Sequence, residues 1–258
     1  MDKLKYVSFD IEQNPHSEYM FSSYAGFKVD KSLLLSAAFY DHQTHARTVL
    51  HLDAKELKAY VDCDNIKDKD ERLAAKSKKD KGLVSAVLQE LNKYNVIVTW
   101  YGKRHDVKYI NGKAAMHGLP YCYEPKHIDL FDTYKHKFSL SSNRLGNAAK
   151  IMGVKPKGEI CPSRWSQARE GNYKALQEIA DYNINDVDTL YELYQPVKEI
   201  ISNHPHILAL SDFKPKDRIK YCKWCGSDKI TPSGSYITAA GVKKPRVKCS
   251  VCQPRKYI

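Results

Sequence analysis

The chain has 258 residues, of which 42% are hydrophobic and 28% are charged, and its mean hydropathy is −0.57. This length allows one large domain with an appendage, or two domains. No apolar run approaches the ~18 residues that a membrane-spanning helix needs, and the N-terminus runs straight into a predicted strand without a signal peptide. We therefore expect a protein without a membrane span, located in the cytoplasm.

The positive charge of the chain is concentrated near its C-terminus. The net charge is +12, and residues 213–258 hold twelve Lys/Arg against two Asp/Glu, so residues 1–212 are close to neutral. A basic appendage of this kind indicates contact with a polyanion such as nucleic acid. A tail that only improves solubility would have the same composition.

The elements expected in chain order are those of an α/β protein. β-rich or buried apolar runs predict strands at Lys5–Glu12, Ser32–Tyr40, Arg47–Leu52, Asn95–Trp100 and Lys126–Phe131. Helical spacing of apolar residues predicts helices at Ala54–Val61, Gly82–Tyr94, Asp106–His117, Asn143–Met152 and Asn172–Tyr194, the last stopped by Pro196. The charged segment Asp62–Lys81 is expected to be a solvated insert, partly helical or mobile, without a chemical role. This order predicts a mixed sheet, antiparallel at its start and parallel later, between helices.

The first candidate site lies at the end of the first predicted strand, in YVSFDIE. Asp10 and Glu12 project to the same face because side chains alternate along a strand. Two neighbouring carboxylates repel each other unless a cation lies between them. The alternative is an exposed strand end, where the two charges are harmless.

Two later segments add further candidates. Tyr182 and Asp186 are four residues apart on a predicted helix and share a face, whereas Asp181 and Asp188 are expected on other faces. Asp106 follows a predicted strand and begins a predicted helix. Taken alone, Tyr182 could be a core aromatic residue, Asp186 a solvated one, and Asp106 an acid that stabilises a helix N-terminus.

Together these segments resemble the DEDD exonucleases of the ribonuclease H-like fold. IVTWYGKRHD resembles their second motif, and GNYKALQEIADYNINDVDTLYELYQPVKEIISNHPHI their last. A tyrosine at the position of Tyr182 marks the tyrosine-type subgroup, which includes the proofreading exonuclease domains of family B DNA polymerases and small stand-alone relatives often found in phages. The resemblance covers roughly residues 1–210, and a phage-encoded protein would act in the host cell.

The resemblance implies a two-metal hydrolase. Asp10, Glu12, Asp106 and Asp186 would hold two Mg²⁺ or Mn²⁺ ions, which suit hard oxygen ligands. Tyr182 would position the attacking water, because a phenol that ordinarily titrates at about pH 10 is a poor base at neutral pH. The expected reaction is 3′–5′ exonucleolytic cleavage, preferably of DNA, that releases nucleoside 5′-monophosphates. Three alternatives stay open: a ribonuclease, a structure-specific endonuclease, or a nucleic-acid-binding protein with weak catalysis.

The second motif departs from the pattern of that family. The family often has Asn, three residues, an aromatic residue and then Asp, where this chain has Tyr101 and His105 before Asp106. The Asn usually touches the substrate near the scissile end, so its replacement leaves open how this chain holds its substrate and which nucleotides it prefers. Tyr101 could stack on a base or belong to the core, and His105 could pack or form a polar rim. We treat both as candidate substrate-binding residues.

Four cysteines near the C-terminus have the spacing of a structural zinc site. They form two CxxC pairs separated by 23 residues, and they are Cys222, Cys225, Cys249 and Cys252. Two such pairs can surround one tetrahedral Zn²⁺, and a short hairpin between them resembles a zinc ribbon. A redox role for one pair is the alternative. The other cysteines are expected to be reduced and without function: Cys63, Cys122 and Cys161.

Basic side chains cluster beside the second cysteine pair, at Lys243, Lys244, Arg246 and Lys248. With nearby aromatic residues they suit single-stranded nucleic acid or a 3′ end, although a zinc ribbon can also dock a protein. The expected organisation is therefore an exonuclease domain at residues 1–212, a zinc ribbon at residues 213–258, and a linker at about residues 203–220.

Overall fold

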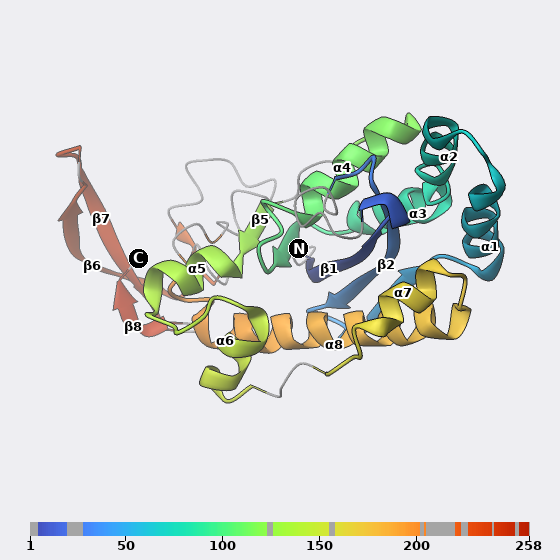
Figure 1. The fold of residues 1–258 in the computed structure, drawn as a ribbon. Helices are drawn as coiled ribbons and strands as arrows, with labels where there is room; N and C mark the ends of the chain where they lie inside the picture. Colours follow the sequence, from blue (N-terminus) through green and yellow to red (C-terminus); the bar gives the residue numbers. More distant parts are fainter. Residues whose placement is uncertain are drawn as a thin grey trace. The chain divides into compact units, whose positions relative to one another are not determined.

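The computed structural model describes residues 5–19, 28–122, 126–154, 158–201, 204, 220–222, 227–238, 240–250 and 253–257 (Figure 1). The chain divides into two compact units: Lys5–Ser202, and a C-terminal unit that begins at Asn203 and includes Met1–Leu4. Among the helices within the described ranges, none is long and apolar enough to cross a membrane.

The larger unit contains a five-stranded mixed sheet in the order β3-β2-β1-β4-β5. The strands are β1 (Tyr6–Pro15), β2 (Ser32–Asp41), β3 (Arg47–His51), β4 (Val96–Thr99) and β5 (Lys126–Asp129). β2 pairs antiparallel with β1 and β3, while β4 runs parallel to β1 and β5 parallel to β4. The expected mixed sheet with an antiparallel start is confirmed.

Helices cover both faces of this sheet (Figure 1). They are α1 (Ala54–Asp62), α2 (Lys69–Lys76), α3 (Lys81–Leu91), α4 (Asp106–His117), α5 (Leu130–Lys137), α6 (Leu145–Met152), α7 (Ser163–Arg169) and α8 (Tyr173–Val197). Short 3₁₀ turns lie at Ser17–Tyr19 and Cys63–Asn65. The long helix α8 packs across β1, β2 and β3, and α3 and α4 cover the opposite face.

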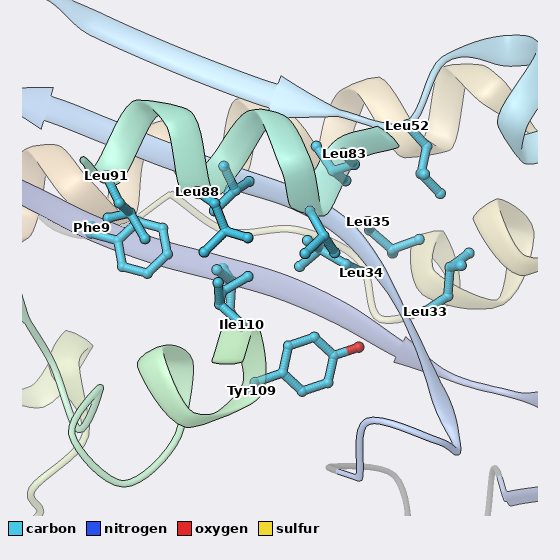
Figure 2. Close-up of a cluster of buried hydrophobic side chains, with 14 of the residues drawn as sticks. Phe9, Leu33, Leu34, Leu35, Leu52, Leu83, Leu88, Leu91, Tyr109 and Ile110 are labelled. Carbon is cyan, nitrogen blue, oxygen red and sulfur yellow. The ribbon is translucent and has the colours of Figure 1, made fainter. Parts of the chain in front are cut away.

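The alternation of side chains along β1 decides which residues reach α8. Val7, Phe9 and Ile11 are buried in the core formed with α3 and α4, and Figure 2 shows Phe9 beside Leu91 of α3. Because the period of a strand is two residues, Asp10 and Glu12 lie on the other face, under α8. A β-bulge between Glu12 and Gln13 interrupts the pairing with β2 directly after this pair of acids.

Three expectations about element boundaries are wrong. The first strand, expected to end at Glu12, continues to Pro15. The strand expected at Lys126–Phe131 ends at Asp129, whose carboxylate accepts the N–H of Phe131 and caps the unexpected helix α5. The short helix α7 was also not expected. Pro196 does not stop α8, which continues to Val197. A proline in the last turn interrupts the helix only where it is about to end.

The insert Asp62–Lys81 is not wholly solvated, which corrects the expectation from its composition. It contains α2, and Asp80 is fully buried. The Asp80 carboxylate binds the Lys113 ammonium and His117 Nε2, each at 2.7 Å, and accepts the N–H of Leu34 at 2.9 Å. Burial alone would raise the pKa of Asp80, but the contacts with His117 and Lys113 outweigh it and hold the pKa below its usual value. The insert is thereby fastened to β2 and α4.

The C-terminal unit contains a three-stranded antiparallel sheet in the order β6-β7-β8. Its strands are β6 (Ile230–Ile237), β7 (Lys243–Cys249) and β8 (Gln253–Tyr257). β6 and β7 form a hairpin, with a register shift between Pro232 and Ser235 where Gly234 takes a φ of 86°. Glycine suits this conformation because it has no Cβ.

Candidate metal centre and nucleic-acid contacts

Three carboxylates from two elements meet under α8. Ligand oxygens of Asp10, Glu12 and Asp186 lie within 4.8 Å of one another, with Asp10 and Glu12 half-buried and Asp186 buried. The first two come from the middle of β1 and the third from the middle of α8. Clustered carboxylate oxygens of this kind can hold a hard divalent cation such as Mg²⁺ or Mn²⁺.

Asp106 lies beside this cluster, at the start of α4. Its carboxylate accepts the backbone N–H of Ile11, the residue between Asp10 and Glu12. The parallel pairing of β4 with β1 extends only to Ser8, so Ile11 lies beyond it, and Asp106 supplies an acceptor there. Asp106 does not join the three acids within 4.8 Å of one another, but its bond to Ile11 places it beside the same part of β1.

The carboxyl group of Asp106 is buried, and burial dominates its electrostatic environment. Burial raises the pKa of Asp106 to about 7. The hydrogen bonds from its own N–H and from Ile11 lower the pKa, and the nearby carboxylate of Asp129 raises it. Bringing a cation to this carboxyl would displace its proton, because a metal ligand binds in its ionised form.

Asp129 is the acidic residue that sequence reasoning missed. It is buried at the end of β5, and the carboxyl ends of β4 and β5 lie level with the middle of β1, where Val98 pairs with Ser8. Burial raises its pKa, as it does for Asp106. The available signal was an aspartate that ends a short parallel strand and caps the helix that follows.

Tyr182 is half-buried one helical turn before Asp186, and its ring packs edge-on against Trp165 of α7, with ring centroids 5.9 Å apart. The carbonyl of Trp165 accepts a hydrogen bond from Asn14 Nδ2 at 2.6 Å, and Arg169 Nη1 donates to Asn14 Oδ1 at 3.2 Å. Helix α7 is thus tied to the end of β1 and restricts the position of the Tyr182 ring.

Further contacts fix α8 over the sheet. Buried Asn183 donates from Nδ2 to the hydroxyl of Ser36 at 3.0 Å, and Ser36 is the cross-strand partner of Glu12. Asp188 pairs with Arg47 of β3 at 2.7 Å, and Asp181 is exposed. Both acids therefore lie outside the metal cluster, on the faces expected for them.

The two candidate substrate residues of the second motif differ in exposure. Tyr101 is exposed at the end of β4, whereas His105 is half-buried, with its ring centroid 6.1 Å from that of Tyr109. Burial lowers the pKa of His105, which favours the neutral imidazole. Of the two, only Tyr101 offers a large exposed surface to a ligand.

Two of the four candidate zinc ligands fall within the described residues. Cys222 and Cys249 are fully buried, while Cys225 and Cys252 lie outside the described part of the chain. The basic candidates all lie on β7 and are exposed: Lys243, Lys244, Arg246 and Lys248. Of the scattered cysteines, Cys63 and Cys122 are buried and Cys161 is exposed.

A family model of the RNase H superfamily matches residues 49–198, more than half of the chain. The chain therefore belongs to the RNase H superfamily. The matched range includes Asp106, Tyr182 and Asp186, and it begins after Asp10 and Glu12. The comparison with curated proteins found no match.

Among solved structures, the chain is similar to the family B DNA polymerase from the hyperthermophilic archaeon Pyrobaculum calidifontis, with a TM-score of 0.51 and 13% sequence identity. The likeness covers 92% of this chain and 31% of the polymerase chain, so this chain spans less than a third of the length of that polymerase. At this identity the likeness shows the fold. The RNase H-like fold is thus confirmed, and together with the acidic cluster it indicates a nuclease.

Proposed function

We propose that the chain is a metal-dependent 3′–5′ exonuclease of the tyrosine type, which prefers DNA and releases nucleoside 5′-monophosphates. The observation that carries the proposal is the convergence of Asp10, Glu12 and Asp186 within 4.8 Å, with Asp106 bonded to the strand between the first two. Such a set of acids would be repulsive without a cation. The likeness to a family B polymerase supports the exonuclease class.

Asp10, Glu12, Asp106 and Asp186 would hold the metal ions. When bound, the ions supply acidity for the attacking water and charge stabilisation for the leaving oxygen. Tyr182 lies on the same helix face as Asp186 and orients the water through its hydroxyl. Trp165 packs edge-on against the Tyr182 ring and restricts the rotation of that ring, which keeps the hydroxyl in place.

We also propose that the C-terminal unit is a zinc ribbon that holds the nucleic acid. Buried thiols at Cys222 and Cys249 are fitting ligands for Zn²⁺, with Cys225 and Cys252 as the other two. The metal would supply the folding energy that so small a unit lacks. Bound zinc would have a structural role in this unit.

One face of β7 carries the charge that this role needs. Lys244, Arg246 and Lys248 share a face because they alternate along the strand. Tyr236 is the cross-strand partner of Lys244, and the Arg246 guanidinium lies 5.6 Å from the centroid of its ring. Cations beside a stackable ring suit a single strand of nucleic acid.

The salt dependence of binding tests this face. Replacing its three cations by alanine should lower the slope of log K against log salt by up to about three. A charge-matched control replaces three exposed lysines of the catalytic unit: Lys55, Lys67 and Lys69. An unchanged slope in the β7 variant would favour a protein-docking role for the ribbon.

The exonuclease assignment is tested with matched single-stranded DNA and RNA oligonucleotides, labelled at the 5′ or 3′ end and incubated with Mg²⁺ or Mn²⁺. We expect the 5′-labelled DNA to shorten stepwise, and Asp10→Ala and Asp186→Ala to abolish the ladder while exposed Asp181→Ala preserves it. Preferential RNA cleavage, internal cuts, or binding without cleavage would identify one of the three alternatives. Full activity in either carboxylate variant would contradict the site.

A further inference from the structure

The turn after β4 contains a strained and exposed tyrosine. Tyr101 has a φ of 69°, a left-handed conformation that bulky residues rarely adopt. Its neighbour Gly102 has no room for a side chain, because a Cβ there would lie 2.5 Å from the Thr99 Cβ. The turn is therefore tightly constrained, yet Tyr101 is 43% exposed. Burial of the ring does not account for a bulky residue at this position.

The carboxylate of Asp129 holds this turn in place. Asp129 Oδ1 accepts the N–H of Tyr101 at 2.7 Å and the N–H of Phe131 at 3.1 Å, and Oδ2 accepts the N–H of Lys103 at 3.2 Å. One buried side chain thus links the end of β4 to the start of α5. It brings the two aromatic residues Tyr101 and Phe131 together.

These two rings form a surface with cations above it. The ring centroids of Tyr101 and Phe131 are 4.8 Å apart at an angle of 73°. The Arg104 guanidinium lies 5.5 Å from the Tyr101 centroid and 5.8 Å from that of Phe131, and it pairs with Asp132 at 2.7 Å. Lys135 Nζ lies 5.8 Å from the Phe131 centroid. Aromatic faces with adjacent cations match the base and phosphate of a nucleotide.

The surface lies at the ends of β4 and β5, beside the strand that carries two acids of the metal cluster. Asp129, which holds Tyr101, pairs with Thr99 of β4. The residue before Thr99, Val98, pairs with Ser8 of β1, two residues before Asp10. Asp106, at the start of α4, is bonded to Ile11 between two members of the cluster. A strand whose terminal phosphodiester reached these acids would pass its nearby bases over Tyr101.

We propose that Tyr101, Phe131 and Arg104 form a stacking platform for a base close to the 3′ end, and that Asp129 is its positioning residue. This inference rests on the proposed function, because it takes the substrate to be a single strand with its end at the metal cluster. Stacking of this kind tolerates any base, so the platform would grip the strand without reading its sequence.

The test couples a change in the protein to a change in the ligand. In an Asp10→Ala background, which leaves the strand uncut, binding of a 5′-fluorescein-labelled oligonucleotide is measured by anisotropy. It is compared with the same oligonucleotide lacking the bases of its three 3′-terminal nucleotides. Tyr101→Gly removes the ring and keeps the turn, because glycine adopts a φ of 69° without strain. The control is Tyr121→Gly, at a tyrosine that is 65% exposed elsewhere.

We expect removal of the bases to weaken binding by about 5- to 150-fold in the background protein and by much less after Tyr101→Gly. The unfolding temperature of the Tyr101→Gly variant should stay equal or rise. If removal of the bases weakens binding equally with and without the Tyr101 ring, the platform is overturned. Failure of the intact oligonucleotide to bind would overturn it too. Because this readout needs no cleavage, a stacking result with an inactive enzyme would contradict the exonuclease assignment and leave the platform standing.

Two substitutions, which remove one or both carboxylate oxygens of Asp129, test whether Asp129 positions the platform. Asp129→Asn keeps the oxygen that accepts the backbone N–H groups of Tyr101 and Phe131. This variant should therefore bind the intact oligonucleotide nearly as the background protein does. Asp129→Ala should weaken binding as Tyr101→Gly does, and combining the two should add little, because Asp129 acts through Tyr101. Fully additive losses in the double variant would show that Asp129 does not position the platform.

Discussion

Neutralising one acid of the metal cluster should stabilise the metal-free protein. Asp10 lies within 4.8 Å of both Glu12 and Asp186. At that separation two unit charges repel by about 1 kcal/mol in water and about 3 kcal/mol at an effective dielectric constant of 20. We therefore expect Asp10→Asn to stabilise the metal-free fold by about 1–3 kcal/mol. That gain corresponds to a rise of about 2–12 °C in unfolding temperature.

The order of stability should reverse when metal is added. Saturating Mn²⁺ at 100 times its Kd stabilises the wild-type protein by about 2.7 kcal/mol, whereas Asp10→Asn loses most of that gain. Thermal unfolding of both proteins in buffer without Mg²⁺ or Mn²⁺, and again with added Mn²⁺, measures this crossing. The control is Asp181→Asn, an exposed acid of α8 outside the cluster. The reasoning would be refuted if Asp10→Asn were less stable than the wild-type protein without metal and were still stabilised by Mn²⁺ as much as the wild-type protein is.

Two further predictions concern residues around the site and in the insert. Tyr182→Phe should lower the rate of cleavage by at least tenfold with little change in Mn²⁺ affinity, because the hydroxyl positions water and is not a ligand; an unchanged turnover rate would refute that role. Asp80→Asn should destabilise the fold by about 3–5 kcal/mol at neutral pH, because it leaves Lys113 buried without its counter-charge. The pKa of Asp80 is lowered in the fold, so its contribution is present at neutral pH and is lost as the pH falls below about 4. Urea unfolding of wild type and variant should therefore converge in acid, and a constant difference down to pH 2 would contradict this.

The strand and helix that carry the cluster could be predicted because their patterns are local. Alternation along β1 places Asp10 and Glu12 on one face, and the helical period places Tyr182 and Asp186 on one face of α8. These rules need only neighbouring residues. The resemblance to a known family then predicted that the two faces meet, which no local rule contains.

The residues that were missed depend on tertiary contacts. Asp129 caps α5 like many helix N-terminal acids, and its bonds to the turn at Tyr101 come from another strand. Trp165 lies on a helix of only seven residues that is held by Asn14 and packs on α8, so its own sequence gives a weak helical signal. Asp80 stands in a segment with the composition of a solvated loop, and its buried partners come from α4.

The most direct test of the central claim, that metal ions held by these acids contact the scissile phosphate, is a sulfur substitution in the substrate. A phosphorothioate at the 3′-terminal linkage replaces an oxygen ligand by sulfur, which binds Mg²⁺ poorly and the softer Mn²⁺ better. We predict that one stereoisomer is cut far more slowly than the all-oxygen substrate in Mg²⁺, and that Mn²⁺ restores most of the rate. Equal cleavage of the sulfur and oxygen substrates in Mg²⁺, or cleavage that needs neither metal, would contradict the account.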